Sequence, residues 1–285
     1  MNLADFDTLT RLLRSEGFNT KKSLGQNFLV DATVCPAMAT AACDNNTGVL
    51  EIGPGAGVLT VCLSEQAKKV VAIELDERLK PVLNKSLATC FNTQVIFGDA
   101  MKLNLTEIIK ENFSDCTRVA VCANLPYYIT SPIIMMLLES HLPIDNITVM
   151  VQKEAAERLC AEVGSRKAGA VTVAVSYYAK AEMLFDVDRS SFMPPPNVDS
   201  AVIQLTLRKE PCVTVDDEKF FFSFVKACFA QRRKTLVNTV SSVMNIDKDT
   251  LRSALHSVGL SETVRSENLS MEELSAVANF LYKNK

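Results

Sequence analysis

The sequence predicts an α/β protein in which a parallel, doubly wound, Rossmann-like sheet is followed by a small all-helical domain. Short apolar runs alternate with helical segments from residue 48 onwards, which is the pattern of parallel strands joined by crossover helices. A glycine-rich turn follows the first of these runs, where such sheets bind nucleotides. From residue 217 the apolar spacing is helical throughout. We therefore expect two domains, 1–208 and 209–285.

The elements follow in order along the chain. A helix is predicted over 4–16, with Gly17 at its end, and a polar loop over 21–31 ends on Asp31 as a helix N-cap. That loop is either an ordinary connection or a lid over a ligand. The predicted strands are 49–52, 70–74, 94–97, 118–123 and 147–151, and the helices between them are 57–66, 77–89, 104–111 and 131–140. Runs at 171–178, 181–185 and 200–207 could extend the sheet, partly antiparallel, and the helical domain is predicted as 217–230, 234–244, 247–257 and 271–282.

Composition narrows the class of protein. The 285 residues are 48% hydrophobic and 22% charged, which is ordinary for a globular chain, and no apolar run is long enough to span a membrane. The N-terminus does not have the pattern of a signal peptide. Nine cysteines without a Cys-x-x-Cys pair favour a reducing compartment and argue against a zinc site. We expect a cytoplasmic monomer without a metal. The net charge of −3 argues mildly against a nucleic-acid partner, but local basic patches are compatible with it.

The glycine-rich turn Glu51-Ile-Gly-Pro-Gly-Ala-Gly57 opens the first crossover helix. Its glycines lie at 53, 55 and 57, whereas a dinucleotide fingerprint would place the last one at position 58, which is valine. The spacing suits the tight turn that lets S-adenosylmethionine approach the backbone, although such turns also occur for packing alone. We therefore expect Gly53 and Gly55 to contact the cofactor.

Carboxylates follow the next two strands. Glu74 ends the second strand, 21 residues after Gly53, where an acidic residue accepts hydrogen bonds from ribose hydroxyls. Asp99 follows the third strand and can accept from an adenine amine. A single carboxylate at a strand end is often only a helix N-cap. Because these groups follow successive strands on one edge of the sheet, the sequence predicts a pocket for an adenosyl cofactor.

The stretch Asn124-Leu-Pro-Tyr127 ends the fourth strand and is suited to an exocyclic amine. The Asn124 side-chain carbonyl and the Leu125 backbone carbonyl can each accept one amine hydrogen, since Pro126 shapes the turn and has no N–H. Tyr127 offers a flat face for a planar base. The plainer interpretation is a strand that ends in a turn, with Ser131 and Pro132 as N-cap and first residue of the next helix.

Basic residues cluster at three places. These are Lys21-Lys22, Arg166-Lys167 and Arg232-Arg233-Lys234. The last cluster lies between the first two helices predicted for the helical domain and would contact RNA phosphates, or else form a solvated face. We expect Lys21, Lys22, Arg232, Arg233 and Lys234 to bind RNA.

Several motifs in order give the chain its family resemblance. They include the glycine turn, the strand-end carboxylates and the Asn124 motif. The chain also contains Lys22-Ser-Leu-Gly-Gln-Asn-Phe-Leu29, Gln152-Lys-Glu-Ala-Ala-Glu-Arg158, Phe192-Met-Pro-Pro-Pro-Asn-Val-Asp-Ser200 and Phe229-Ala-Gln-Arg-Arg-Lys-Thr-Leu-Val-Asn238. Over nearly its whole length the chain resembles the KsgA-type small-subunit rRNA adenine N6,N6-dimethyltransferases, which have a class I methyltransferase sheet and a helical ribosome-binding domain.

The resemblance implies dimethylation, dependent on S-adenosylmethionine, of two adjacent adenosines in the 3′-terminal hairpin of small-subunit rRNA. It also implies that Phe192 stacks on the target base opposite Tyr127. The cofactor contacts that it implies are Asn27, Leu29, Gly53, Glu74, Asp99 and Asn124.

Two positions depart from the family pattern. Ala168 stands where an aromatic residue is usual, which would alter a packing or RNA contact. Ser266 stands where the family commonly has proline, which would relax a loop.

Two other functions are compatible with the sequence. One is the related large-subunit rRNA adenine methyltransferase of the macrolide-resistance type, which shares the glycine turn and an Asn-x-Pro-Tyr motif. The other is a ribosome-assembly factor that acts mainly by binding, with methylation as its release signal. The continuation Tyr128-Ile-Thr-Ser-Pro132 and the helical tail favour the small-subunit enzyme.

Overall fold

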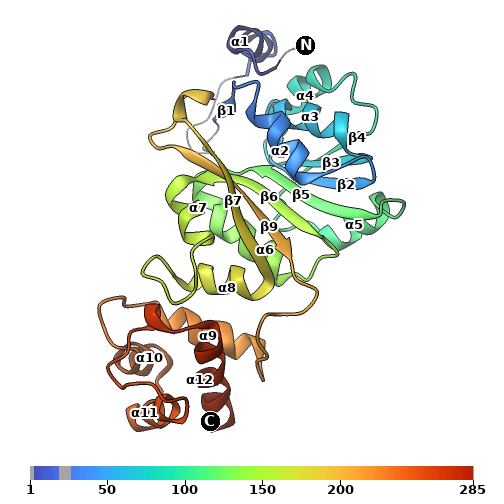
Figure 1. The fold of residues 1–285 in the computed structure, drawn as a ribbon. Helices are drawn as coiled ribbons and strands as arrows, with labels where there is room; N and C mark the ends of the chain where they lie inside the picture. The colour runs from blue at the N-terminus through green and yellow to red at the C-terminus, as the bar shows by residue number, and fades with distance from the viewer. Residues whose placement is uncertain (1–2, 19–26, 285) are drawn as a thin grey trace. The chain divides into compact units, whose positions relative to one another are not determined.

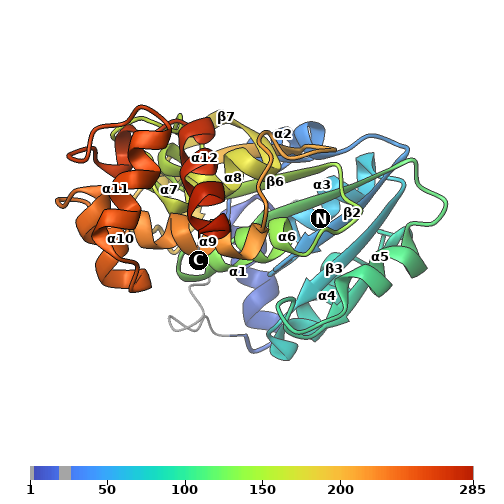
Figure 2. The ribbon, with the colours of Figure 1, turned by 90° about the horizontal axis from the view of Figure 1, so that it is seen from below.

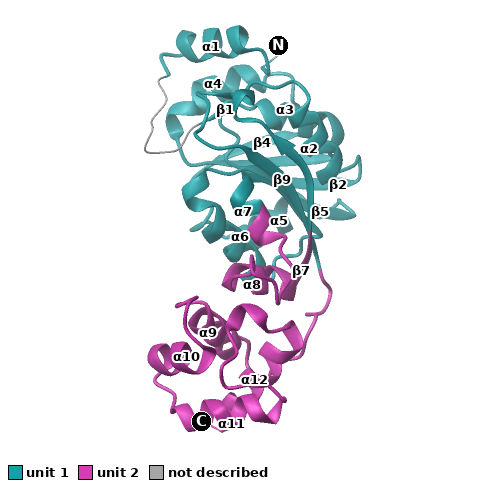
Figure 3. Cartoon of the chain, turned by 60° about the vertical axis from the view of Figure 1, so that its left-hand side comes forward, with its two compact units in different colours: residues 1–156, 182–207 teal, residues 157–181, 208–285 magenta. Residues whose placement is uncertain are grey.

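The computed structural model describes residues 3–18 and 27–284, and the chain divides into two compact units (Figures 1 and 3). The first unit comprises residues 1–156 and 182–207, and the second comprises 157–181 and 208–285. Residues 157–181, which the sequence placed in the first domain, thus belong to the second unit. Within the described part of the chain, every helix is too short or too polar to span a bilayer.

A seven-stranded mixed sheet organises the first unit. Its strands are β2 (Thr47–Ile52), β3 (Lys69–Glu74), β4 (Thr93–Phe97), β5 (Arg118–Asn124), β6 (Asn146–Gln152), β7 (Ala179–Val187) and β9 (Ser200–Leu207). Their spatial order is β4–β3–β2–β5–β6–β9–β7. Strands β2 to β6 pair in parallel, and β9 runs antiparallel to β6. The predicted doubly wound sheet with an antiparallel extension is confirmed.

Helices lie on both faces of this sheet. The helices along this stretch of the chain are α1 (Phe6–Ser15), α2 (Val34–Ala42), α3 (Val58–Gln66), α4 (Lys80–Ser86), α5 (Leu105–Asn112), α6 (Thr130–Glu139) and α7 (Lys153–Leu159), of which α7 begins in the first unit and ends in the second. One face packs against α2 and α3 through Val49, Val70 and Ala120, which are fully buried. Alternate residues of a strand point to the opposite face, where the Phe113 ring at the end of α5 fills the space beside Gly48. A side chain at position 48 would collide with that ring, so this strand requires glycine there.

Four helices form most of the second unit. They are α9 (Glu218–Cys228), α10 (Leu236–Met244), α11 (Lys248–Ser257) and α12 (Met271–Lys283), and they agree with the predicted helical tail. Helix α9 packs against α10 and α12, and α11 packs against α10 and α12 (Figure 2). A capping box starts α12, because Ser270 and Glu273 exchange side-chain and backbone hydrogen bonds.

The strand predicted over 171–178 is wrong, because this segment forms helix α8 (Ala170–Tyr178). Its valines and tyrosines favour a strand by propensity. However, the Thr172 hydroxyl accepts a hydrogen bond from the Gly169 N–H and so starts a helix. Residues on almost all sides of α8 are buried, so tertiary packing outweighs local propensity.

Three predicted helix starts are also corrected. Asp31 accepts hydrogen bonds from the N–H and hydroxyl of Thr33, but α2 begins later, at Val34. Helix α6 begins at Thr130 and not after Ser131, because the 3-10 turn Tyr127–Ile129 leads directly into it. Arg232, Arg233 and Lys234 lie in a turn, since α10 begins at Leu236.

The two departures from the family pattern both lie in the second unit. Ser266 is buried, and its hydroxyl donates to the Cys228 carbonyl at 2.8 Å, so it fixes the loop that the sequence suggested it would relax. Ala168 is fully buried, and its carbonyl accepts a hydrogen bond from Arg232. Position 168 therefore belongs to the packing of this unit.

Candidate active site

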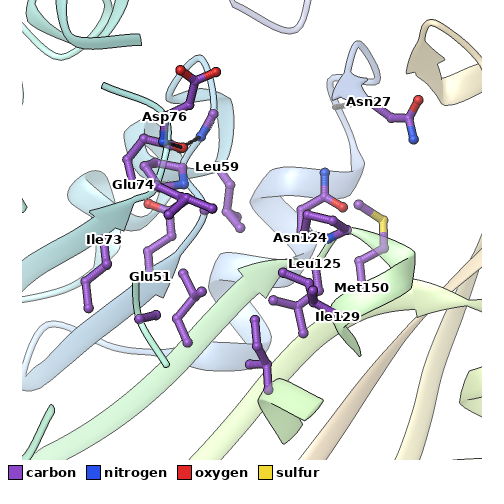
Figure 4. Close-up of a pocket in the computed structure, with 18 of the residues that line it drawn as sticks. Asn27, Glu51, Leu59, Ile73, Glu74, Asp76, Asn124, Leu125, Ile129 and Met150 are labelled. Carbon is purple, nitrogen blue, oxygen red and sulfur yellow. Dashed lines mark hydrogen bonds between the residues drawn. The ribbon is translucent and has the colours of Figure 1, made fainter. Parts of the chain in front are cut away.

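A pocket of about 320 Å³ lies at the carboxyl ends of β2, β3, β4 and β5 (Figure 4). This is the edge at which open α/β sheets bind ligands, and the volume is that of a small-molecule site. All of its lining residues belong to the first unit. The pocket gathers the predicted Asn27, Leu29, Gly53, Gly55, Glu74, Asp99, Asn124, Leu125, Pro126, Tyr127 and Phe192.

The glycine turn leaves its backbone open to this pocket. Gly53 has a φ of +74°, which favours glycine, and no atom of residues 3–18 or 27–284 lies within 4 Å of the place a side chain would occupy. Gly57 has a φ of +88° and lies against the Ser86 hydroxyl, so there the absence of a side chain serves packing. The turn therefore offers open space at its first glycine, where a ligand can approach the backbone.

Glu74 is held rigidly at the end of β3. Its two carboxylate oxygens accept from the Gly55 N–H at 3.1 Å and from the Asp76 N–H at 2.8 Å. Burial raises the pKa of Glu74. A carboxylate can accept about four hydrogen bonds, so two positions remain for a ligand hydroxyl pair such as that of a ribose.

Glu51, which the sequence placed only within the glycine turn motif, is a further lining residue. It is 1% exposed, and its Oε2 atom has no hydrogen-bond partner among the described residues. Burial raises the pKa of Glu51 to about 8. The signal available in the sequence was an acidic residue inside a buried strand, which is rare unless it is paired or functional.

The adenine end of the predicted pocket combines a carboxylate with apolar side chains. One Asp99 oxygen accepts from the Met101 N–H at 3.0 Å, and the other lies 3.4 Å from the Lys102 ammonium group. Asp99 thus stabilises its own turn while it lines the pocket. Leu75 and Met101 also line it, and their apolar side chains are 54% and 47% exposed. The sequence contains no signal for either of them, because isolated apolar residues form no pattern.

Two acceptors lie together at the end of β5. Neither the Asn124 side chain nor the Leu125 carbonyl accepts a hydrogen bond from a residue in the described part of the chain. The Leu125 N–H donates to the Met150 carbonyl at 3.3 Å, which anchors the turn to β6. Both acceptors are therefore open to a ligand in the described part of the chain, and their joint contact with one amine stays a prediction.

Tyr127 is fixed by a second segment of the chain. Its hydroxyl lies 2.9 Å from the Ser200 hydroxyl, and Ser200 is fully buried at the start of β9. Burial raises the pKa of Tyr127, so the phenol stays neutral. The sequence placed Ser200 at the end of the Phe192 motif without a role, and the structure shows that it orients the tyrosine ring.

Two very short strands bring distant predicted residues together. Strand β1 (Phe28–Leu29) pairs antiparallel with β8 (Phe192–Met193), so that Leu29 lies opposite Phe192. The Ser191 hydroxyl also donates to Asp31 at 2.9 Å. Phe192 is only 4% exposed and belongs to the hydrophobic core as well as to the pocket lining. Its stacking on a base stays a prediction.

The predicted RNA-binding residues of the second unit differ in their contacts within the protein. The Arg232 guanidinium donates to the Arg166 and Ala168 carbonyls at 2.8 and 3.0 Å, so it has a structural role. Arg233 and Lys234 are exposed in the same turn. The predicted contacts Lys21 and Lys22 lie outside the described residues. In the described part of the chain, no three His, Cys, Asp or Glu side chains form a group that could hold a metal ion.

The strand order, the open glycine turn and the paired acceptors after β5 together define a methyltransferase of the Rossmann-like α/β class. The sequence model of the family described as ribosomal RNA adenine dimethylase matches residues 17–283, and the chain belongs to this family.

Relatives of known name agree with that assignment. The chain is 45% identical over 276 residues to ribosomal RNA small subunit methyltransferase A of Bacillus pumilus, covering 95% of this chain and 94% of the relative. It is 47% identical over 274 residues to the protein of the same name from Bacillus licheniformis, with the same coverage.

Two solved structures are similar over most of the chain. A dimethyladenosine transferase from Plasmodium falciparum aligns with a TM-score of 0.75 and 29% identity, covering 90% of this chain and 98% of that one. The 23S rRNA methyltransferase ErmE aligns with a TM-score of 0.66 and 26% identity, covering 90% and 99%.

Proposed function

We propose that this enzyme dimethylates the N6 amines of two adjacent adenosines in the 3′-terminal hairpin loop of small-subunit rRNA, in the cytoplasm, with S-adenosylmethionine as the methyl donor. The observation that carries the proposal is a pair of acceptors at the carboxyl edge of the sheet, Asn124 Oδ1 and the Leu125 carbonyl, to which none of the described residues donates a hydrogen bond. The small-subunit assignment is supported by relatives at 45–47% identity, against 26% for the 23S enzyme.

The residues of the pocket fit this cofactor. Glu74 retains acceptor positions for ribose hydroxyls, Gly53 leaves its backbone open, and Leu75 and Met101 offer apolar surfaces for the adenine. Asp99 would accept from the adenine amine. When bound, S-adenosylmethionine supplies an electrophilic methyl group on a sulfonium. Asn27, Leu29, Gly55 and Asn124 complete the proposed contacts.

Asn124 and Leu125 would act by positioning. An adenine amine is a poor nucleophile, because its lone pair is delocalised into the ring. Two acceptors that hold both of its hydrogens turn the lone pair out of conjugation and stabilise the positive charge that grows on nitrogen. No histidine lines the pocket among the described residues, so the proton can leave to water after transfer. A monomethylated amine has one hydrogen left, so the second transfer uses one acceptor.

Tyr127 and Phe192 would hold the base after it leaves its stack in the RNA. Unstacking costs a few kcal/mol, and stacking on a side chain returns about 1–3 kcal/mol per face. Arg233 and Lys234 would bind RNA phosphates from the second unit, together with Lys21 and Lys22 from the N-terminal region. Arg232 would support them by holding the turn.

The test is to incubate the protein with labelled S-adenosylmethionine and each ribosomal subunit in turn, and then to locate the modified base. Two dimethylated adenosines near the 3′ end of small-subunit rRNA are expected. Methylation of the large subunit alone would instead favour a 23S rRNA methyltransferase, which is the activity in the name of ErmE. Tight binding to immature small subunits without methyl transfer would favour an assembly factor.

A further inference from the structure

Glu51 is a buried carboxyl group with one oxygen atom that no described residue satisfies by a geometrically sound hydrogen bond. It lies on β2, directly before the glycine turn, and lines the pocket beside Glu74 (Figure 4). It is 1% exposed, and its Oε2 atom accepts no hydrogen bond from the described residues. A buried polar atom without a partner is costly, so its retention at a ligand site points to the ligand.

The groups around Glu51 make a negative charge there unfavourable in the ligand-free protein. The titratable groups that act on it are Glu74 from β3, Cys62 from α3, Cys35 from α2 and Cys122 from β5, and none of them is basic. Thr60 is the remaining polar neighbour, and its hydroxyl lowers the pKa of Glu51, which offsets only part of the effect of burial. Because desolvation raises its pKa to about 8, Glu51 is mostly protonated at neutral pH.

The other acids of the pocket are already compensated or hydrogen-bonded. Asp76 accepts from the Arg78 guanidinium at 2.8 Å, and Asp99 lies near the Lys102 ammonium group. Glu74 has two backbone N–H donors. The described lining contains no lysine, arginine or histidine. Glu51 is therefore the lining carboxyl group whose charge depends most on what enters the pocket.

We propose that Glu51 is the residue by which the pocket distinguishes a sulfonium cofactor from its thioether product. The carboxyl group is protonated in the ligand-free protein, releases its proton to solvent when the cationic cofactor binds, and takes a proton up again once the ligand is neutral at sulfur. This inference rests on the proposed function, because it takes S-adenosylmethionine as the ligand.

The physical reason is the effect of a nearby positive charge. A cation favours the ionised form of a carboxyl group and lowers its pKa, most strongly in a desolvated site. By linkage, affinity for the cation then rises with pH over the range in which the free protein still binds the proton. The thioether product carries no charge at sulfur, so its affinity lacks this pH dependence. Each turnover thus weakens the hold on the spent cofactor relative to the fresh one.

Calorimetry of ligand binding tests the proposal without reference to catalysis. S-adenosylmethionine and S-adenosylhomocysteine are each titrated into the full chain at pH 7, in buffers of different ionisation enthalpy, which gives the number of protons exchanged. Both ligands carry the same amino and carboxyl groups, so the difference between them isolates the sulfonium. We expect close to one additional proton released with S-adenosylmethionine, and a ratio of the two affinities that rises by up to about 50-fold from pH 6 to pH 8.

Two variants assign the proton. Glu51→Gln, which keeps the shape and removes the titration, should abolish the difference in proton number and flatten the affinity ratio. Glu111→Gln, an exposed glutamate on α5, is the matched control and should behave as the natural protein. Since the first comparison needs only the natural protein, it stands even if Glu51→Gln fails to fold.

The outcomes separate the inference from the proposed function. Equal proton exchange with the two ligands would overturn the role of Glu51 while the cofactor assignment stands. The same proton difference in folded Glu51→Gln would also overturn it, because another group would then carry the proton. Binding of neither ligand would overturn the proposed cofactor, and the inference with it.

Discussion

The two sides of the pocket differ in the kind of oxygen they present (Figure 4). The side formed by β2 and β3 presents the buried carboxyl groups of Glu51 and Glu74, whose pKa values are raised by burial. The side formed by the end of β5 presents a side-chain amide and a backbone carbonyl, which have no charge to gain or lose. Carboxylates suit a cation and ribose hydroxyls, whereas neutral acceptors can orient an amine without removing its proton. The comparison predicts that binding of the cofactor responds to pH, and that methyl transfer does not.

The largest expected effect comes from the neutral side. Asn124→Ala should lower turnover at least about 100-fold, the magnitude typical for loss of one preorganised polar group, while subunit affinity changes little. Asn124→Asp keeps an acceptor oxygen and should lose less. The measurement is the rate of methyl transfer with saturating subunit and cofactor, alongside subunit binding. If Asn124→Ala lost subunit binding but still reacted at the normal rate once bound, the residue would be a binding group.

On the carboxylate side, Glu74→Ala should raise the cofactor dissociation constant at least tenfold. Loss of two hydrogen bonds to a charged acceptor costs about 1.5–3 kcal/mol each, and 1.4 kcal/mol corresponds to tenfold. Because Glu74 lines the pocket and not the core, the variant should remain folded. Calorimetric titration measures the affinity, and a thermal melt checks the fold. An unchanged affinity would show that this carboxylate does not contact the cofactor.

The same side should impose a pH dependence on stability. Glu51 has a folded pKa of about 8, above the ordinary value of 4.5, so the folded protein binds the proton more tightly. The stabilising contribution of Glu51 is therefore fully present below pH 4.5. It is lost as the pH rises through 8, by roughly 1.4 kcal/mol per pH unit. Denaturant unfolding of the natural chain between pH 5 and 8 should show a steeper decline than that of Glu51→Gln. Parallel curves for the two proteins would refute a buried, titrating Glu51.

A second contrast lies within the turn formed by Arg232, Arg233 and Lys234, whose residues should differ in role. Replacing Arg233 and Lys234 by alanine should weaken subunit binding and reduce the slope of log affinity against log salt by about 1–2, since each phosphate contact contributes about one unit. Arg232→Ala should instead lower the stability of the second unit, because its guanidinium donates to the Arg166 and Ala168 carbonyls. An unaltered salt slope in the double variant would show that Arg233 and Lys234 do not contact RNA phosphates.

The smallest effect is expected at Ser200. Ser200→Ala removes one hydrogen bond to the Tyr127 hydroxyl, worth about 1 kcal/mol, so transfer should slow by about fivefold through a less ordered ring. Tyr127→Phe removes the same bond from the other partner and should give the same loss, and the double variant should be no worse than either. Additive losses would mean that the two hydroxyls act separately.

The sheet and the helical tail could be predicted because strand-length apolar runs, glycines and caps are local signals. The segment 171–178 could not, since its strand-like composition yields to burial on almost all sides of α8. Likewise, the pairing of β1 with β8 joins residues about 160 positions apart through two-residue strands, which are too short to show any periodicity.

Much of the site was also within reach of the sequence. Glu74, Asp99 and Asn124 follow parallel strands, and topology brings the ends of those strands together. The surroundings of each group could not be predicted from the sequence. The burial of Glu51, the bond from Ser200 to Tyr127 and the use of Arg232 within its own unit depend on contacts between distant residues.

The most direct test of the central claim is the pH dependence of a single turnover, measured by rapid quench with saturating cofactor and subunit from pH 6.5 to 9. Positioning by neutral acceptors predicts a rate that is flat across this range, both in the natural chain and in Glu51→Gln. A rate that rises tenfold per pH unit and then levels off at a pKa within this range would show that a titrating base removes the amine proton, and would contradict the account.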